Sequence, residues 1–237
     1  EMSERRHTKS PLISCRYSEK GLENLLKETF GEKTFLHETL TNTLITAVDI
    51  GFHRPQTYLF DSRKAKKLYE SDQVSIPLWQ VARSTSAAPT YFPAYEFTME
   101  SGQRIMSKHA LIDGGLWVNN PSNLVMRALL NFASDNSLYA SHENCIMLSL
   151  GTGYSRNSSQ LPKNAGDINA ARPTISTLME VSSLGTHEYV QETLGRKNYA
   201  RINPELSEAV ELDEIRTPQL DILRKAAESK FEEIDAF

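Results

Sequence analysis

Cysteine is scarce in this sequence, which holds only Cys15 and Cys145 among its 237 residues. Two thiols cannot build the disulfide framework of a small secreted domain. Cys145 lies in an apolar run typical of a buried strand, where a thiol behaves as a small hydrophobic group. This cysteine usage favours a cytoplasmic protein and leaves a secreted one as the alternative.

Long hydrophobic runs are also missing. No uninterrupted apolar stretch approaches the ~20 residues that span a bilayer, so any membrane contact is predicted to be transient and peripheral. The polar start, residues 1–9, does not resemble a signal peptide.

Positive charge is not in excess, because 26 basic residues face 30 acidic ones and the net charge is −4. A nucleic acid is therefore not an expected partner. Hydrophobic residues make up 39% and charged residues 24%, the balance of a soluble globular protein. The length predicts one domain over residues 1–237.

Clustered metal ligands are absent from the sequence pattern. The six histidines show no i, i+4 pairing and no spacing to cysteine that is typical of zinc sites. No metal or other cofactor is predicted, and each histidine is expected to be a surface or hydrogen-bonded polar residue. They are His7, His37, His53, His109, His142 and His187.

What is present is an alternation of strand and helix patterns, which predicts an α/β fold with a mostly parallel central sheet and helices on both faces. Residues 154–171 are rich in Ser, Asn and Gly and are predicted to form a long exposed loop. Helices are expected over residues 19–30, 78–86, 120–132, 173–194 and 218–234. Strands are expected over residues 44–48, 56–60, 145–150 and 199–203, with another ending at Ile112.

The sharpest local signal is the run Leu111-Ile112-Asp113-Gly114-Gly115. An Asp that follows a strand lies where α/β sheets collect their active sites, and two glycines allow a tight turn beside the carboxylate. An Asp-Gly pair taken alone more often marks an aspartate that hydrogen-bonds its own turn.

Three further segments occur in order around this run, namely residues 82–92 (ARSTSAAPTYF), 119–121 (NNP) and 148–153 (LSLGTG). Together the four segments resemble the patatin-like lipid acyl hydrolases, and the likeness extends from about Ser10 to the C-terminal helix. The resemblance implies a three-layer α/β sandwich and a phospholipase A-type hydrolysis of fatty-acyl esters. It implies a phospholipid or other acyl lipid as substrate, found at a membrane surface.

In that family a serine attacks the ester carbonyl, and the aspartate that corresponds to Asp113 takes its proton without an intervening histidine. Gly114 and Gly115 correspond to the turn that follows this aspartate. The segment 83–92 is expected to pack beside Asp113, since both line the family's site. The strands at 44–48, before Asp113 and at 145–150 are expected to share one sheet.

The family's glycine-rich oxyanion loop and its Gly-x-Ser-x-Gly elbow do not occur in these residues. Both are expected upstream of Glu1, so the sequence is interpreted as a patatin-like domain without its N-terminal segment. Ser84, Ser86 and Ser149 lack glycines at the elbow spacing, and no nucleophile is assigned in this chain. By itself the chain is expected to be inactive and unlabelled by a serine-directed phosphonate.

Two other functions stay open. The runner-up is a non-catalytic lipid-binding or scaffold protein that has lost its nucleophile. A serine peptidase is a third reading, although nothing resembles a peptide-binding cleft. A Gly-x-Ser-x-Gly encoded upstream would favour the hydrolase, and a start codon near Met2 would favour the binding protein.

Overall fold

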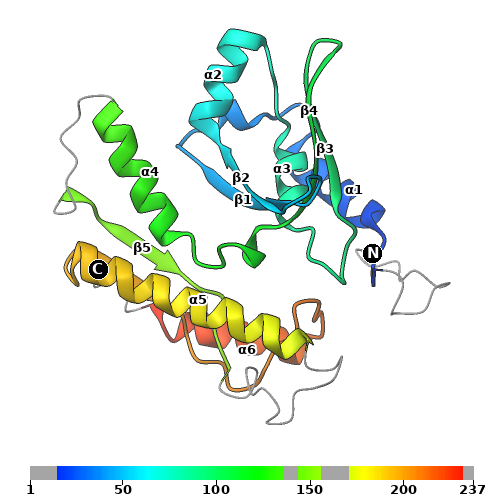
Figure 1. Ribbon diagram of the computed structural model, residues 1–237. Helices are drawn as coiled ribbons and strands as arrows, with labels where there is room; N and C mark the ends of the chain where they lie inside the picture. The colour runs from blue at the N-terminus through cyan, green and yellow to red at the C-terminus, as the bar shows by residue number, and fades with distance from the viewer. Residues whose placement is uncertain (1–14, 136–143, 156–170, 232–237) are drawn as a thin grey trace. The chain divides into compact units, whose positions relative to one another are not determined.

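The computed structural model describes residues 15–135, 144–155 and 171–231. The chain divides into two compact units, Glu1–Trp117 and Val118–Phe237, and most of their helices and strands are labelled in Figure 1. Most of the predicted loop over residues 154–171 and the end of the predicted helix over 218–234 lie outside the described residues.

The first unit is built on a four-stranded antiparallel sheet with the strand order β2-β1-β4-β3. β1 lies between β2 and β4, and Ala47 pairs with Asp113 in the register of β1 and β4. The strands are β1 (Leu44–Asp49), β2 (Gln56–Asp61), β3 (Tyr95–Ser101) and β4 (Arg104–Asp113).

The α/β class is confirmed, but the mostly parallel sheet is corrected here. Short connections account for the difference, because antiparallel strands can be joined by tight turns whereas parallel strands need a crossover of about a dozen residues or more. β3 and β4 are joined through Gly102, whose φ of 61° suits a tight turn. β1 and β2 form a hairpin, and the link between them contains Gly51 and Pro55.

Helices of the first unit begin and end close to the predicted residues. The helix expected over residues 19–30 is α1 (Glu19–Phe30), and the one expected from residue 78 is α3 (Leu78–Thr85). α2 (Ser62–Asp72) and the short 3₁₀ turn η1 (Leu36–Glu38) complete the unit together with η2 (Gly114–Leu116).

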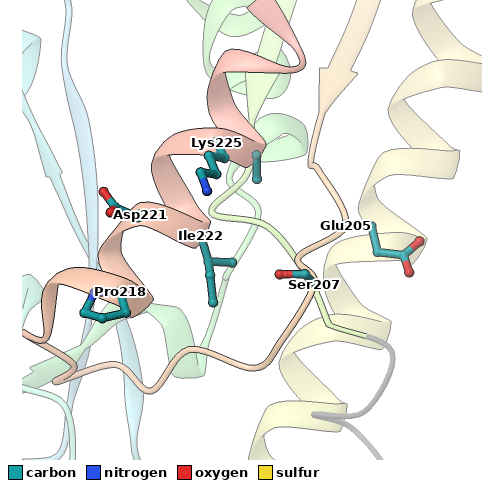
Figure 2. Close-up of a pocket in the computed structure, with 7 residues that line it drawn as sticks. Glu205, Ser207, Pro218, Asp221, Ile222 and Lys225 are labelled. Atoms are coloured by element: carbon teal, nitrogen blue, oxygen red, sulfur yellow. The ribbon is translucent and has the colours of Figure 1, made fainter.

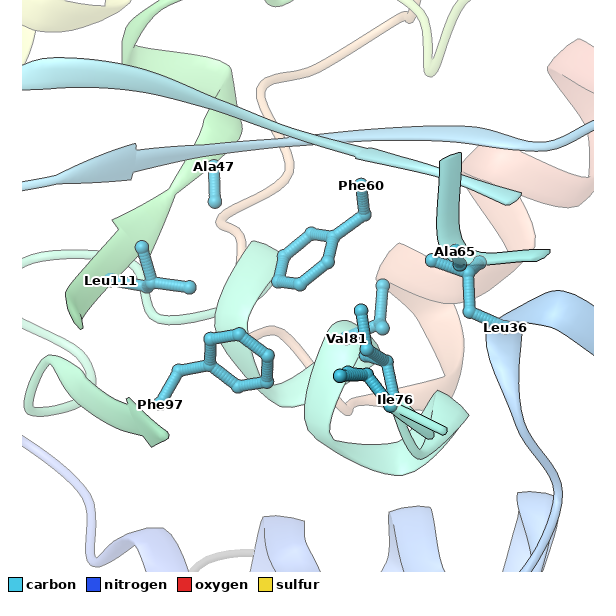
Figure 3. Packing of buried hydrophobic residues seen from close by; sticks show 9 residues of the cluster. Leu36, Ala47, Phe60, Ala65, Ile76, Val81, Phe97 and Leu111 are labelled. Atoms are coloured by element: carbon cyan, nitrogen blue, oxygen red, sulfur yellow. The ribbon is translucent and has the colours of Figure 1, made fainter. Parts of the chain in front are cut away.

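One hydrophobic core lies between this sheet and the helices α2 and α3 (Figure 3). Phe60 and Phe97 meet edge to face with ring centroids 5.5 Å apart, an arrangement that aromatic quadrupoles favour. The buried side chains of the core are Leu36, Ala47, Phe60, Ala65, Val74, Ile76, Val81, Phe97 and Leu111.

The second unit contains two parallel strands, β5 (Met147–Leu150) and β6 (Tyr199–Ile202). The long helix α5 (Ala171–Leu194) lies between them in sequence and gives the length that a parallel crossover needs. α4 (Ser122–Asp135) and α6 (Thr217–Glu228) complete this unit. Cys145 is buried here against Met126 and Val190, as its apolar surroundings predicted.

Two predictions about these elements are wrong. β5 pairs with β6 in a separate two-stranded sheet, so the three strands expected in one sheet do not share one. The helix expected over residues 218–234 was also predicted to point Leu220, Leu223, Ala227 and Phe231 inward. Leu223 is partly buried, but Ala227 is exposed, Leu220 is 43% exposed, and Phe231, which lies beyond the end of α6, is 63% exposed. None of the helices in the described ranges is long and apolar enough to cross a membrane.

The core supplies a test with a matched pair of leucines. Leu36 is 0% exposed and Leu40 is 104% exposed. Leu36→Ala leaves a cavity and is expected to lower the free energy of unfolding by about 2–5 kcal/mol, as buried leucines do. Leu40→Ala should change it by less than about 0.5 kcal/mol. Urea unfolding followed by circular dichroism measures both, and equal effects would contradict this core.

Candidate active site

Asp113 ends β4 and begins a tight turn. It is the N-cap residue of η2, and its Oδ1 accepts a 2.7 Å hydrogen bond from the backbone N–H of Gly115. Its Oδ2 has no hydrogen bond to any residue in the described part of the chain. One carboxylate oxygen therefore orients the side chain, and the other is left to exchange a proton.

Gly114 lets this turn lie directly against β1. A Cβ built on Gly114 would lie 2.1 Å from the carbonyl oxygen of Thr46 and 2.3 Å from its Oγ1. These distances are far below van der Waals contact, so no larger residue fits without backbone movement. The second residue of the Asp-Gly-Gly motif is thus explained by space and not by an unusual φ.

The segment predicted to line the site does lie beside Asp113. The backbone N–H of Asp113 donates to the carbonyl oxygen of Ala87 at 3.1 Å. The Oγ1 of Thr85 donates to the carbonyl oxygen of Thr46 at 2.7 Å. The C-terminal end of α3 therefore holds both β1 and the aspartate turn, which confirms the expected packing of residues 83–92 against Asp113.

Burial sets the electrostatics of this aspartate. Desolvation raises the pKa of Asp113 above its usual range, and the hydrogen bond from the Gly115 N–H lowers it in part. A carboxylate with a raised pKa is a stronger base than an exposed one. Asp113 therefore has the environment that proton abstraction requires, together with a free oxygen to perform it.

The three serines considered from the sequence are occupied in other ways. Ser84 is fully buried and donates to the carbonyl oxygen of Gln80, and Ser86 donates to that of Ala82. Ser149 lies on β5 in the second unit, where its Oγ receives hydrogen bonds from Arg201 and Ser122. None of the three is placed as an elbow serine.

A pocket in the second unit includes none of the predicted site residues (Figure 2). It lies between α6 and the segment that follows β6. Its lining residues are Glu205, Ser207, Pro218, Asp221, Ile222, Lys225 and Ala226.

Sequence reasoning missed one polar constellation, formed by Asp49, Ser107 and His109. The signal was the alternation Ser-x-His on a strand, which places both side chains on one face. The strand Tyr95–Ser101 was missed as well, so its partner strand was recognised only at its end.

The close approach at Gly114 predicts the effect of one methyl group. Gly114→Ala is expected to lower the unfolding free energy by several kcal/mol, because its Cβ meets backbone that cannot move aside. Gly185→Ala in α5 is the control, since its Cβ would meet nothing within 4 Å and a helical glycine gains about 1 kcal/mol on replacement by alanine. Thermal unfolding of both variants is the measurement, and a tolerated Gly114→Ala would contradict the turn geometry.

Comparison with known proteins identifies the fold family. A family model described as patatin-like phospholipase matches residues 6–126, just over half of the chain, and it includes the Ala87 to Asp113 contact.

Three relatives illustrate the extent of the likeness. Patatin-like protein 1 of Arabidopsis thaliana is 35% identical over 118 residues, or 50% of this chain and 27% of the relative. Patatin of Solanum tuberosum is 30% identical over 148 residues, or 60% of this chain and 37% of the relative. Probable inactive patatin-3-Kuras 1 of Solanum tuberosum is 27% identical over 208 residues, or 81% of this chain and 53% of the relative.

The chain thus spans about half or less of the length of these relatives. The match with the family model covers α1 to the start of α4 and contains the whole aspartate turn. On the match and on the site geometry, the chain belongs to the patatin-like phospholipase family.

Proposed function

We propose that this chain forms part of a phospholipase A-type lipid acyl hydrolase in which Asp113 is the general base of a Ser–Asp dyad. The observation that carries the proposal is the aspartate turn, in which Oδ1 is fixed by Gly115 and Oδ2 is free. Membership of the patatin-like phospholipase family supports hydrolysis of acyl lipids in general.

The chemistry assigned to Asp113 follows from its surroundings. A serine hydroxyl, from a Gly-x-Ser-x-Gly segment outside these 237 residues, would give its proton to Oδ2 as its oxygen attacks the ester carbonyl. Burial raises the pKa of Asp113 and thereby strengthens it as a base. The hydrogen bond from the Gly115 N–H to Oδ1 limits rotation of the carboxylate.

The substrate class proposed is a phospholipid or other acyl lipid met transiently at a membrane surface. Without an elbow serine, the chain by itself is proposed to lack phospholipid hydrolysis through Asp113. The location proposed is cytoplasmic, with a secreted protein as the alternative.

Replacement of the base tests the mechanism. In an intact protein that joins this segment to a Gly-x-Ser-x-Gly elbow, Asp113→Asn keeps the side-chain size and removes the basicity. Fatty-acid release from phospholipid vesicles should fall by about 10²–10⁴, the usual contribution of general-base catalysis. Asp72→Asn, at an exposed aspartate of the same unit, should leave the rate unchanged. Normal turnover of Asp113→Asn would remove Asp113 from the mechanism.

Asp113→Asn also has a predicted effect on stability, and measuring it distinguishes a loss of catalysis from a folding defect. Because burial raises the pKa of Asp113 in the folded state, the unfolded carboxyl loses its proton first as the pH rises. Ionisation of Asp113 therefore lowers stability above its folded pKa and has no effect below its unfolded pKa. Asp113→Asn, which can still accept from Gly115, should unfold at the same or a higher temperature than wild type at pH 7. Its advantage should vanish in acid, and thermal unfolding at pH 3 and pH 7 measures this difference.

A second function, non-catalytic lipid binding or scaffolding, is favoured by one observation. The relative that matches over 208 residues is named a probable inactive patatin. Vesicle binding by an intact protein without fatty-acid release would support this function over the hydrolase.

A further inference from the structure

Three polar side chains of the first unit form a continuous hydrogen-bonded chain that the Ser–Asp mechanism does not use. His109 Nδ1 lies 2.5 Å from Asp49 Oδ2, and His109 Nε2 lies 2.8 Å from Ser107 Oγ. In the neutral ring the Nδ1–H donates to the carboxylate, so Nε2 is left to accept the serine proton. These are the atoms that meet in a Ser–His–Asp catalytic triad.

The antiparallel sheet brings the three residues together. Ser107 and His109 are two residues apart on β4, so their side chains project from the same face. Asp49 ends β1 and pairs with Leu111, which places it on that face as well. The juxtaposition therefore depends on the register of β1 with β4.

The carboxylate is the most buried of the three side chains. The side chain of Asp49 is 2% exposed and that of His109 is 12% exposed, whereas Ser107 is partly exposed. Asp49 Oδ1 is fixed by the backbone N–H groups of Gly51 at 2.9 Å and Ala110 at 3.2 Å. A buried, anchored carboxylate and a partly accessible hydroxyl are the order that nucleophilic catalysis needs.

Aromatic rings hold the imidazole in place. The His109 ring lies edge to face with Tyr58 at 4.7 Å between centroids and is stacked with Phe97 at 6.0 Å. Burial and the charge of Asp49 raise the pKa of Tyr58 to about 12, so its phenol stays neutral and does not compete with Asp49 for the imidazole proton.

We propose that Ser107 is a second nucleophile, activated by His109 and Asp49, which accepts acyl groups from small activated esters. Phe52, 50% exposed and 6.2 Å from the His109 ring, offers an apolar surface for a short acyl chain. This proposal differs from the expectation that a serine-directed phosphonate leaves the chain unlabelled. That expectation considered Ser84, Ser86 and Ser149, and it did not consider Ser107.

The reaction balances within these residues and the substrate. Ser107 Oγ forms a bond to the ester carbonyl carbon as its proton moves to His109 Nε2. The carbon–oxygen bond to the leaving alcohol then breaks, and His109 returns the proton to that alcohol. Water, deprotonated by His109, hydrolyses the acyl-serine and restores the Ser107 hydroxyl.

This site is independent of Asp113. Asp113 lies six positions after Ser107 on β4, which is about 20 Å at the usual rise of an extended strand. Asp113 therefore cannot be the base for Ser107, and loss of one site leaves the other testable.

Covalent labelling of the chain by a small fluorophosphonate tests the proposal. Attack by Ser107 Oγ on phosphorus expels fluoride, and the adduct should map to Ser107 by peptide mass spectrometry. The chain unfolded by heat should not react, because an isolated serine hydroxyl lacks a base. Labelling of the folded chain at another residue, or no labelling at all, would overturn the proposal.

Variants assign the roles. Ser107→Ala should abolish labelling, and His109→Gln should slow it by at least about 10², the low end of general-base contributions. Ser101→Ala, at a serine of the same hairpin bonded to a backbone carbonyl, should label at the wild-type rate. Circular dichroism establishes that each variant is folded. Unchanged labelling of folded His109→Gln would show that the histidine only packs.

Discussion

The contact between β1 and β4 is the constraint on which the first unit depends. Gly114 lies so close to the Thr46 carbonyl that a single methyl group would not fit between them, and Thr85 bonds the same carbonyl from α3. Asp113 is paired with Ala47 at this junction and bonded to Ala87. Because these contacts come from both β1 and the end of α3, the position of the aspartate is set by the sheet and the end of α3 together.

The same junction produces the second polar site. Asp49 and Ala47 lie two residues apart on β1, so the register that pairs Ala47 with Asp113 also pairs Asp49 with Leu111. His109 then falls within hydrogen-bond distance of Asp49. A slip of one residue would turn every side chain of β4 to the opposite face and separate both constellations. The register of β1 with β4 therefore positions both the Asp113 turn and the hydrogen-bonded chain of Asp49, His109 and Ser107.

The Asp113 site and the Ser107 site differ in whether a serine is hydrogen-bonded to the proton acceptor. Asp113 has a raised pKa and a free oxygen but no serine bonded to it among the described residues. Ser107 has a histidine and a carboxylate bonded in series. The first arrangement suits the direct Ser–Asp chemistry that we propose for Asp113. The second supplies its own serine and so is complete, as a nucleophile with its base, within one sheet.

Local sequence determined most helices and the turn at Asp113. Helix α1 and the strands β1 and β2 were predicted to within one residue, because periodicity and glycine or proline signals act over a few residues. The turn at Asp113-Gly114-Gly115 and its packing against residues 83–92 also followed from the sequence, through the family resemblance.

Tertiary structure decided what depends on strand pairing. The sequence of β4 shows Ser107 and His109 on one face, but Asp49 is 58 and 60 residues away in the chain, and only the β1–β4 register brings its carboxylate to the imidazole. The sequence also did not determine strand direction, because the order of helices and strands along a chain does not fix which strands pair. Hydrogen bonds between strands form across any distance in sequence, whereas the patterns that a sequence displays report contacts within a few residues.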